Sequence, residues 1–223
     1  LSMAALAAMD IPPLPQDLDV VPGLLDGLEE AAEGDPDLSK EARERVLASL
    51  REARQYLATL RAHQESSAEF RRAAERAPLE SVSLEKDLDA LQDPRPTPVD
   101  APLEELETRL AQAQAELGAA EARLSELQAT LQTHATRPEA ARQRIAQLKQ
   151  TREEVTTQLA AAPGDGGDPV AQARRLAGQM RSRAIAAELK MLEQELLSHG
   201  PRQRVLEQRR DVAQASLQAL RAR

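Results

Sequence analysis

The stretch that decides the fold is residues 103–131, LEELETRLAQAQAELGAAEARLSELQATL. Its leucines and two of its alanines recur at alternating spacings of three and four residues without a break. Such a repeat keeps one apolar stripe on the side of a helix that faces a partner helix. We therefore predict a helix-packing seam formed by nine residues, which are Leu103, Leu106, Leu110, Ala113, Leu117, Ala120, Leu124, Leu127 and Leu131.

The composition extends this prediction to the whole chain. Among 223 residues there are 41 Ala and 33 Leu, whereas Val and Ile together number 12 and the aromatic residues number 2. Sheets depend on β-branched and aromatic residues, while Ala, Leu, Glu, Gln and Arg favour helices. The predicted fold is all-α, an elongated antiparallel coiled-coil bundle of long helices with short connectors.

The charge is placed unevenly. Residues 1–36 contain eight acidic residues and no Lys or Arg, and the remainder of the chain carries 29 of each sign. Balanced charges that alternate along helices indicate solvated faces, so we expect no nucleic-acid partner. The basic stretches are expected to be exposed helix faces, and they are Arg174, Arg175, Arg181, Arg183 and the segment 202–223.

The chain is expected to contain two parts. Residues 1–36 combine five prolines and three glycines with acids, which predicts a flexible leader that buries little surface. Residues 37–223 are expected to form a single helical-bundle domain. The first eight residues, LSMAALAA, are either the end of an export signal or an ordinary chain terminus. The chain contains no run of 18 apolar residues, so no membrane-spanning helix is predicted in it.

Prolines and glycines predict where the helices of the domain begin and end. The first helix is expected from Asp37 or Ser39 to Ala77, with buried positions at Val46, Leu50, Ala53, Leu57 and Leu60. A break before Pro78 is followed by a short helical piece over 83–91 and an extended connector over 93–98. Thr136 and Glu139 match a capping box, which predicts that the helix stops near His134 and that the chain reverses.

Two further segments complete the predicted bundle. The restarted helix is expected to run to about Ala162, and a turn then leads to Asp168 as the N-cap of the next helix. That helix carries two apolar rows, which predicts a central helix with two neighbours. The rows are Ala173, Ala177, Met180, Ala184, Ala187, Met191 and Ile185, Leu189, Leu192, Leu196. Gly200 and Pro201 are expected to interrupt or kink the helix. The apolar periodicity of the last helix is still present where the sequence ends, so we expect the native protein to continue.

No pattern of catalytic or metal-binding residues accompanies these helices. His63, His134 and His199 are far apart in the sequence, and no second ligand stands at metal-binding spacing from any of them. Adjacent acids such as Glu153 and Glu154 point apart on a helix, and the chain has no cysteine. We expect no catalytic residue, no cofactor and no metal, and hence no enzyme.

Several short strings of residues along 38–223 occur in the same order as in a known protein family. They begin with LETRLAQA at 106–113, continue with Leu131-Gln132-Thr133 and Pro138-Glu139, and end with LEQRRD at 206–211. These strings are similar to the N-terminal periplasmic helical domain of potassium-dependent mechanosensitive channels of the MscK or KefA type, within the MscS superfamily. The segment 134–137 departs from that family because it is longer than usual.

The resemblance implies a non-catalytic periplasmic domain of a Gram-negative inner-membrane channel that releases ions on osmotic shock. The pore would lie C-terminal to this chain, and LSMAALAA would be the remnant of an export signal. The implied partners are other subunits or the membrane domain of the same channel, and envelope components. The alternative from the residues alone is a free-standing coiled-coil scaffold that binds helical proteins.

Overall fold

The computed structural model describes residue 12, residues 14–91, residues 102–161 and residues 168–222. Four helices make up 92% of these residues, and no strand occurs among them. The helices are α1 (Val21–Gly34), α2 (Lys40–Leu91), α3 (Leu103–Ala161) and α4 (Pro169–Arg221). The prediction of an all-α helical bundle is confirmed. The segments LSMAALAA and 93–98 and most of the predicted turn before Asp168 lie outside the described residues.

The chain divides into two compact units, to which α2, α3 and α4 all contribute. Unit 1 comprises Leu1–Ser67 and Gln143–Leu192, and unit 2 comprises Ala68–Arg142 and Glu193–Arg223. Whether residues 37–223 act as one domain stays a prediction.

Unit 1 has an apolar core to which the N-terminal segment contributes. Helix α1 inserts four fully or nearly buried side chains, which are Val21, Leu25, Leu28 and Ala32. They pack against the predicted buried row of α2, all of whose members are at most 4% exposed, and against α4. The prediction that residues 1–36 bury little surface is therefore wrong for α1. Spacings of four and three residues give α1 an apolar face despite its neighbouring prolines and glycines.

In addition to this apolar contact, arginines of α2 and α4 bind the acidic N-terminal segment within unit 1. Arg54 of α2 bonds both Asp26 and Glu29 at 2.8 Å. Arg43 donates to two backbone carbonyls at the end of α1, and Arg183 of α4 donates to the carbonyls of residues 14 and 15. Arg175, Arg181 and Arg183 are half-buried, contrary to the expected exposed face, whereas Arg174 is exposed as predicted.

Helix α2 begins at Lys40, next to Ser39, which is one of the two predicted starting points. The Ser39 hydroxyl accepts a hydrogen bond from the backbone N–H of Ala42, so Ser39 is the N-cap. The predicted break before Pro78 is wrong, because α2 continues through Pro78 to Leu91. A proline inside a helix costs about 3 kcal/mol or more. The adjacent Ala77 is 4% exposed, so α2 is packed against its neighbours at this level.

The predicted reversal near His134 is also wrong, because α3 is continuous through Pro138. Thr136 caps no helix start. Its hydroxyl instead donates to the carbonyl of Thr133, one turn earlier in the same helix, at 3.0 Å. Pro201 lies inside α4, so the helix is not interrupted there, and a kink at Gly200 and Pro201 stays a prediction.

Helix α4 is the central helix that its two apolar rows predict. Asp168 accepts a hydrogen bond from the N–H of Val170, which confirms it as the N-cap. In unit 1, Glu188 of α4 contacts both His63 of α2 and Arg144 of α3. Of the predicted rows, Ala187, Met191 and Leu196 are half-buried, and the other members are buried.

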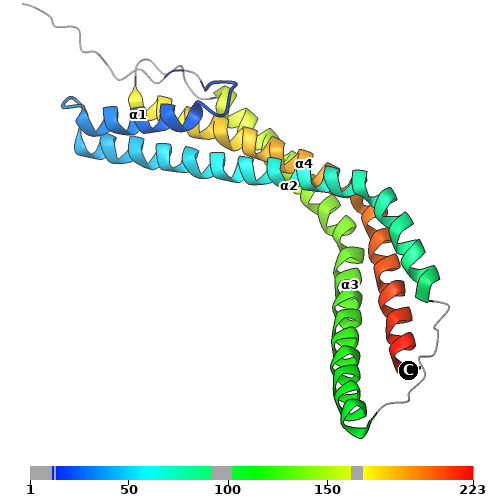
Figure 1. The fold of residues 1–223 in the computed structure, drawn as a ribbon. Coiled ribbons are helices and arrows are strands. Elements are labelled where there is room, and N and C mark those ends of the chain that lie inside the picture. Colours follow the sequence, from blue (N-terminus) through cyan, green and yellow to red (C-terminus); the bar gives the residue numbers. More distant parts are fainter. Residues whose placement is uncertain (1–11, 13, 92–101, 162–167, 223) are drawn as a thin grey trace, which may run out of the picture. The chain divides into compact units, whose positions relative to one another are not determined.

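Within unit 2, α3 runs opposite to α4, as Figure 1 shows for the green and red helices. Its apolar core is thin. The buried apolar side chains described in this unit are Ala77, Ala141, Val205, Ala213 and Leu217. The buried polar side chains of the unit are His134, Glu195 and Ser198. The buried polar side chains of unit 2 therefore lie at one level of α3 and α4.

Candidate functional site

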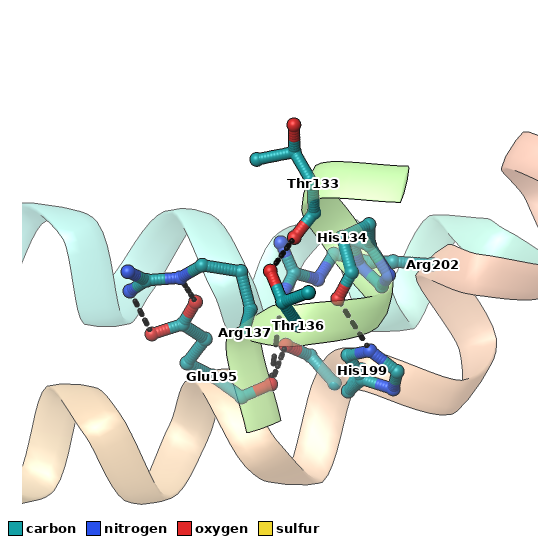
Figure 2. Close-up of polar contacts among 8 residues, drawn as sticks. Thr133, His134, Thr136, Arg137, Glu195, His199 and Arg202 are labelled. Carbon is teal, nitrogen blue, oxygen red and sulfur yellow. Dashed lines mark hydrogen bonds and ion pairs between the residues drawn. The ribbon is translucent and has the colours of Figure 1, made fainter. Parts of the chain in front are cut away.

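The candidate site is a polar cluster between α3 and α4 of unit 2. Figure 2 shows five of its side chains projecting toward one another from α3 and α4, which are His134, Arg137, Glu195, His199 and Arg202. We define the polar cluster as His134 and Arg137 of α3, Glu195, Ser198, His199 and Arg202 of α4, and Phe70 of α2.

Pro138 explains why the cluster forms at this level of α3. A helical carbonyl normally accepts from the N–H four residues later, and a proline there supplies no donor. The carbonyl of His134 is in this position relative to Pro138. The Nε2–H of His199 donates to that carbonyl at 3.0 Å, so α4 replaces the hydrogen bond that α3 lacks.

A charged pair lies one helical turn from this contact. Arg137 Nε and Nη2 donate to the two carboxylate oxygens of Glu195, each at 2.8 Å. The Glu195 side chain is 5% exposed and that of Arg137 is 47% exposed. The hydrogen bond to Glu195 raises the pKa of Arg137 above its usual value. A bidentate pair of this geometry fixes the register of the two helices as well as their contact.

The two histidine rings stack on each other, with centroids 4.2 Å apart and planes 21° apart. His134 is 9% exposed, and both of its ring nitrogens are buried without a hydrogen-bond partner in the described part of the chain. Burial lowers the pKa of His134, and the electrostatic effects of His199 and Arg202 lower it further, against a smaller opposing effect of Glu195. These surroundings disfavour the protonated form of His134.

Arg202 links the polar cluster to α2. Its guanidinium carbon lies 4.5 Å from the centre of the Phe70 ring, which is within cation–π range. Its Nη2 donates to the carbonyl of Glu195 at 3.4 Å, and the Ser198 hydroxyl donates to the same carbonyl at 3.0 Å. Burial lowers the pKa of Arg202.

The surface beside the cluster is a shallow groove of about 460 Å³. It is lined by Glu126, Ala129, Thr130, Thr133, His134, Arg137, Glu195 and Arg202. A second hollow, of about 280 Å³, is lined largely by small side chains near Ala119 and Ala213. No group of three residues that could hold a metal ion occurs in the residues that the structure describes. The chemistry of the cluster is suited to holding two helices together.

The comparisons with known proteins identify the family. The sequence model described as "mechanosensitive ion channel porin domain" matches residues 28–223. The chain belongs to this family. It is a channel family and not an enzyme family. The searches of curated proteins and of solved structures found no match.

The match places most of the described helices inside the porin domain. It begins within α1, so the first part of that helix precedes the matched region. A search of the described helices finds none with the length and apolar character that a membrane span requires.

The nine predicted seam residues of this porin domain differ in exposure. Leu103 and Leu110 are 73% and 59% exposed, and Ala113 is also exposed. The others are half-buried, and they are Leu106, Leu117, Ala120, Leu124, Leu127 and Leu131. That all nine form one packing seam stays a prediction.

Sequence reasoning missed the polar cluster. It treated the histidines as isolated, whereas His134 and His199, 65 residues apart, are stacked. One local signal was available, because His134 stands four residues before Pro138 and its carbonyl therefore needs a donor from outside α3. Arg137 and Glu195 are 58 residues apart, and no local pattern links them.

Proposed function

We propose that this chain is the non-catalytic periplasmic domain of a large mechanosensitive channel of the MscK or KefA type. The pore lies C-terminal to it, and the domain modulates or scaffolds that pore during ion efflux on osmotic shock. The observation that carries this proposal is the family match over residues 28–223. The ordered strings that resemble MscK-type channels support the narrower assignment.

The periplasmic location rests on the same resemblance. A fusion that places alkaline phosphatase directly after Arg223 of the full-length protein tests the periplasmic location. Enzyme activity is expected, since the reporter folds only after export, and an inactive fusion of normal abundance would contradict the proposal.

The proposed contact with other subunits, or with the membrane domain of the same channel, uses the exposed part of α3. Leu103, Leu106, Leu110 and Ala113 continue the rhythm of the half-buried positions that follow them. In the described part of the chain, Leu103, Leu110 and Ala113 are exposed and Leu106 is half-buried. An exposed apolar stripe on a regular helix is typical of a helix-binding surface.

The decisive experiment deletes Asp37–Arg223 from the full-length channel and records currents from membrane patches. Conductance is expected to persist. The tension needed for opening, or its dependence on external ions, is expected to change, because a domain biases a gate only by contacting its closed and open states with different free energy.

A point variant provides the matched test of the proposed surface. Leu110→Asp is expected to reproduce part of the change in threshold, whereas Thr108→Asp, at an exposed position off the stripe, is not. Loss of conductance in the deleted channel despite normal insertion would overturn the modulatory role. If the deleted channel kept its opening threshold and its response to external ions, scaffolding would be the only one of the two proposed roles left.

A further inference from the structure

We propose that the His134–His199 stack is a proton-sensitive latch between α3 and α4 of unit 2, closed while His134 is neutral and opened by its protonation. The contact holds α3 and α4 together through ring stacking at 4.2 Å and through the bond from His199 to the carbonyl of His134. The latch does not depend on the channel assignment, because it is a property of these two helices.

The groups around His134 make its protonation unfavourable in the closed state. From α4 it faces His199, Arg202 and Glu195, and Arg137 lies one turn further along α3. Helix α2 contributes the apolar ring of Phe70, over which Arg202 lies. Among these groups Glu195 is the one carboxylate, and both of its oxygens already accept from Arg137.

A proton added to His134 would therefore meet the charge of Arg202 without a free carboxylate to neutralise it. Both ring nitrogens of His134 are buried and lack an acceptor among the described residues. A buried charge without a partner is costly. Separation of α3 from α4 would expose the ring to water and remove this cost, so protonation and opening are coupled.

The direction of the pH dependence follows from the lowered pKa of His134. In the open state the ring regains an ordinary histidine pKa near 6.5. The closed state is therefore fully favoured above that value, and it loses stability as the pH falls below it. The open fraction is expected to rise up to about tenfold between about pH 7.5 and pH 5.5.

The cysteine-free chain allows a direct test. Ser198, which is fully buried beside the stack, is replaced in Ser198→Cys, and the rate at which a maleimide labels the thiol reports opening of unit 2. Ser49→Cys, at a buried serine of α2 in unit 1, is the matched control. Each rate is divided by the rate for the same variant in urea, which removes the pH dependence of the thiol itself.

The expected result is that the Ser198→Cys rate rises severalfold relative to the Ser49→Cys rate on acidification to about pH 5.5. In a His134→Phe background, which keeps an aromatic ring that does not titrate, the rise is expected to disappear. A constant ratio, or an equal rise in the His134→Phe background, would overturn the latch.

A second measurement does not depend on the folding of a variant. Magnetic resonance follows the ring protons of the three histidines in the unsubstituted chain, and His63→Gln and His199→Gln spectra assign the resonances. The His134 resonance is expected to titrate with a pKa below that of an ordinary histidine. Titration at or above the ordinary value would contradict the proposal.

Discussion

At the scale of single residues, Pro138 has an effect opposite to the one its local sequence predicts. The Thr136–Glu139 pattern is typical of a helix start, yet the helix continues and recovers the lost hydrogen bond from His199. The replacement donor comes from another helix. Local pattern and tertiary packing therefore compete at this position, and packing prevails.

A double-mutant cycle tests this replacement. His199→Phe keeps a stacking ring but removes the donor, and it is expected to lower the free energy of unfolding by about 1 kcal/mol. In a Pro138→Ala background the new N–H satisfies the carbonyl of His134, so His199→Phe is expected to cost close to nothing. Urea unfolding of the four proteins measures the coupling. Equal costs in both backgrounds would show that the bond does not compensate for the proline.

The buried carboxylate of Glu195 makes a second residue-scale prediction. Arg137→Met leaves this side chain, which is 5% exposed, without its cation, and is expected to destabilise the chain by about 2 kcal/mol. Arg144→Met is the matched control, because Arg144 makes a similar fork with Glu188, which is more exposed and retains His63 nearby. We expect the control to cost less than about 1 kcal/mol. Thermal unfolding of both variants tests the difference, and equal costs would contradict it.

At the scale of elements, two leucines in equivalent positions of a heptad rhythm can have unlike surroundings. Leu50 of α2 is fully buried, because α1 and α4 both cover it, whereas Leu110 of α3 is 59% exposed. Periodicity shows which face of a helix is apolar. It does not show whether a neighbour covers that face.

The contrast predicts different costs for the same substitution. Leu50→Ala is expected to destabilise the chain by about 3 kcal/mol, because it removes a buried side chain and leaves a cavity. Leu110→Ala is expected to change stability by less than about 0.5 kcal/mol. Urea unfolding of the two variants of this chain is the measurement. A large loss for Leu110→Ala would mean that its face is covered in solution.

At the scale of the whole molecule, the acidic N-terminal segment belongs to the core of unit 1. Helix α1 covers apolar residues of α2 and α4, and arginines from both of those helices hold the segment. Eight acids without a base are typical of a solvated leader. Of the four acids within α1, Asp26 and Glu29 bind Arg54, and Glu30 and Glu33 are exposed, while the opposite side of the helix is apolar.

Truncation therefore has a defined consequence. Removal of residues 1–35 is expected to cost several kcal/mol and to raise the fluorescence of a hydrophobic dye, since each buried Val or Leu of α1 contributes roughly 1.5–3 kcal/mol. The double variant Asp26→Asn, Glu29→Gln removes the charges that Arg54 binds and keeps the apolar face. It is expected to cost less than about 1 kcal/mol. A truncated chain as stable as the intact one would restore the leader interpretation.

The sequence by itself determined the helical class, the apolar faces of α2 and α4, the approximate start of α2 and the N-cap Asp168. These features depend on residue propensities and on contacts within one or two turns, which the order of residues specifies directly. Only the tertiary structure decided that the helices continue through Pro78, Pro138 and Pro201, that α1 is part of a core, and that His134 meets His199. Each of these depends on groups distant in sequence, whose combined packing outweighs a local preference of a few kcal/mol.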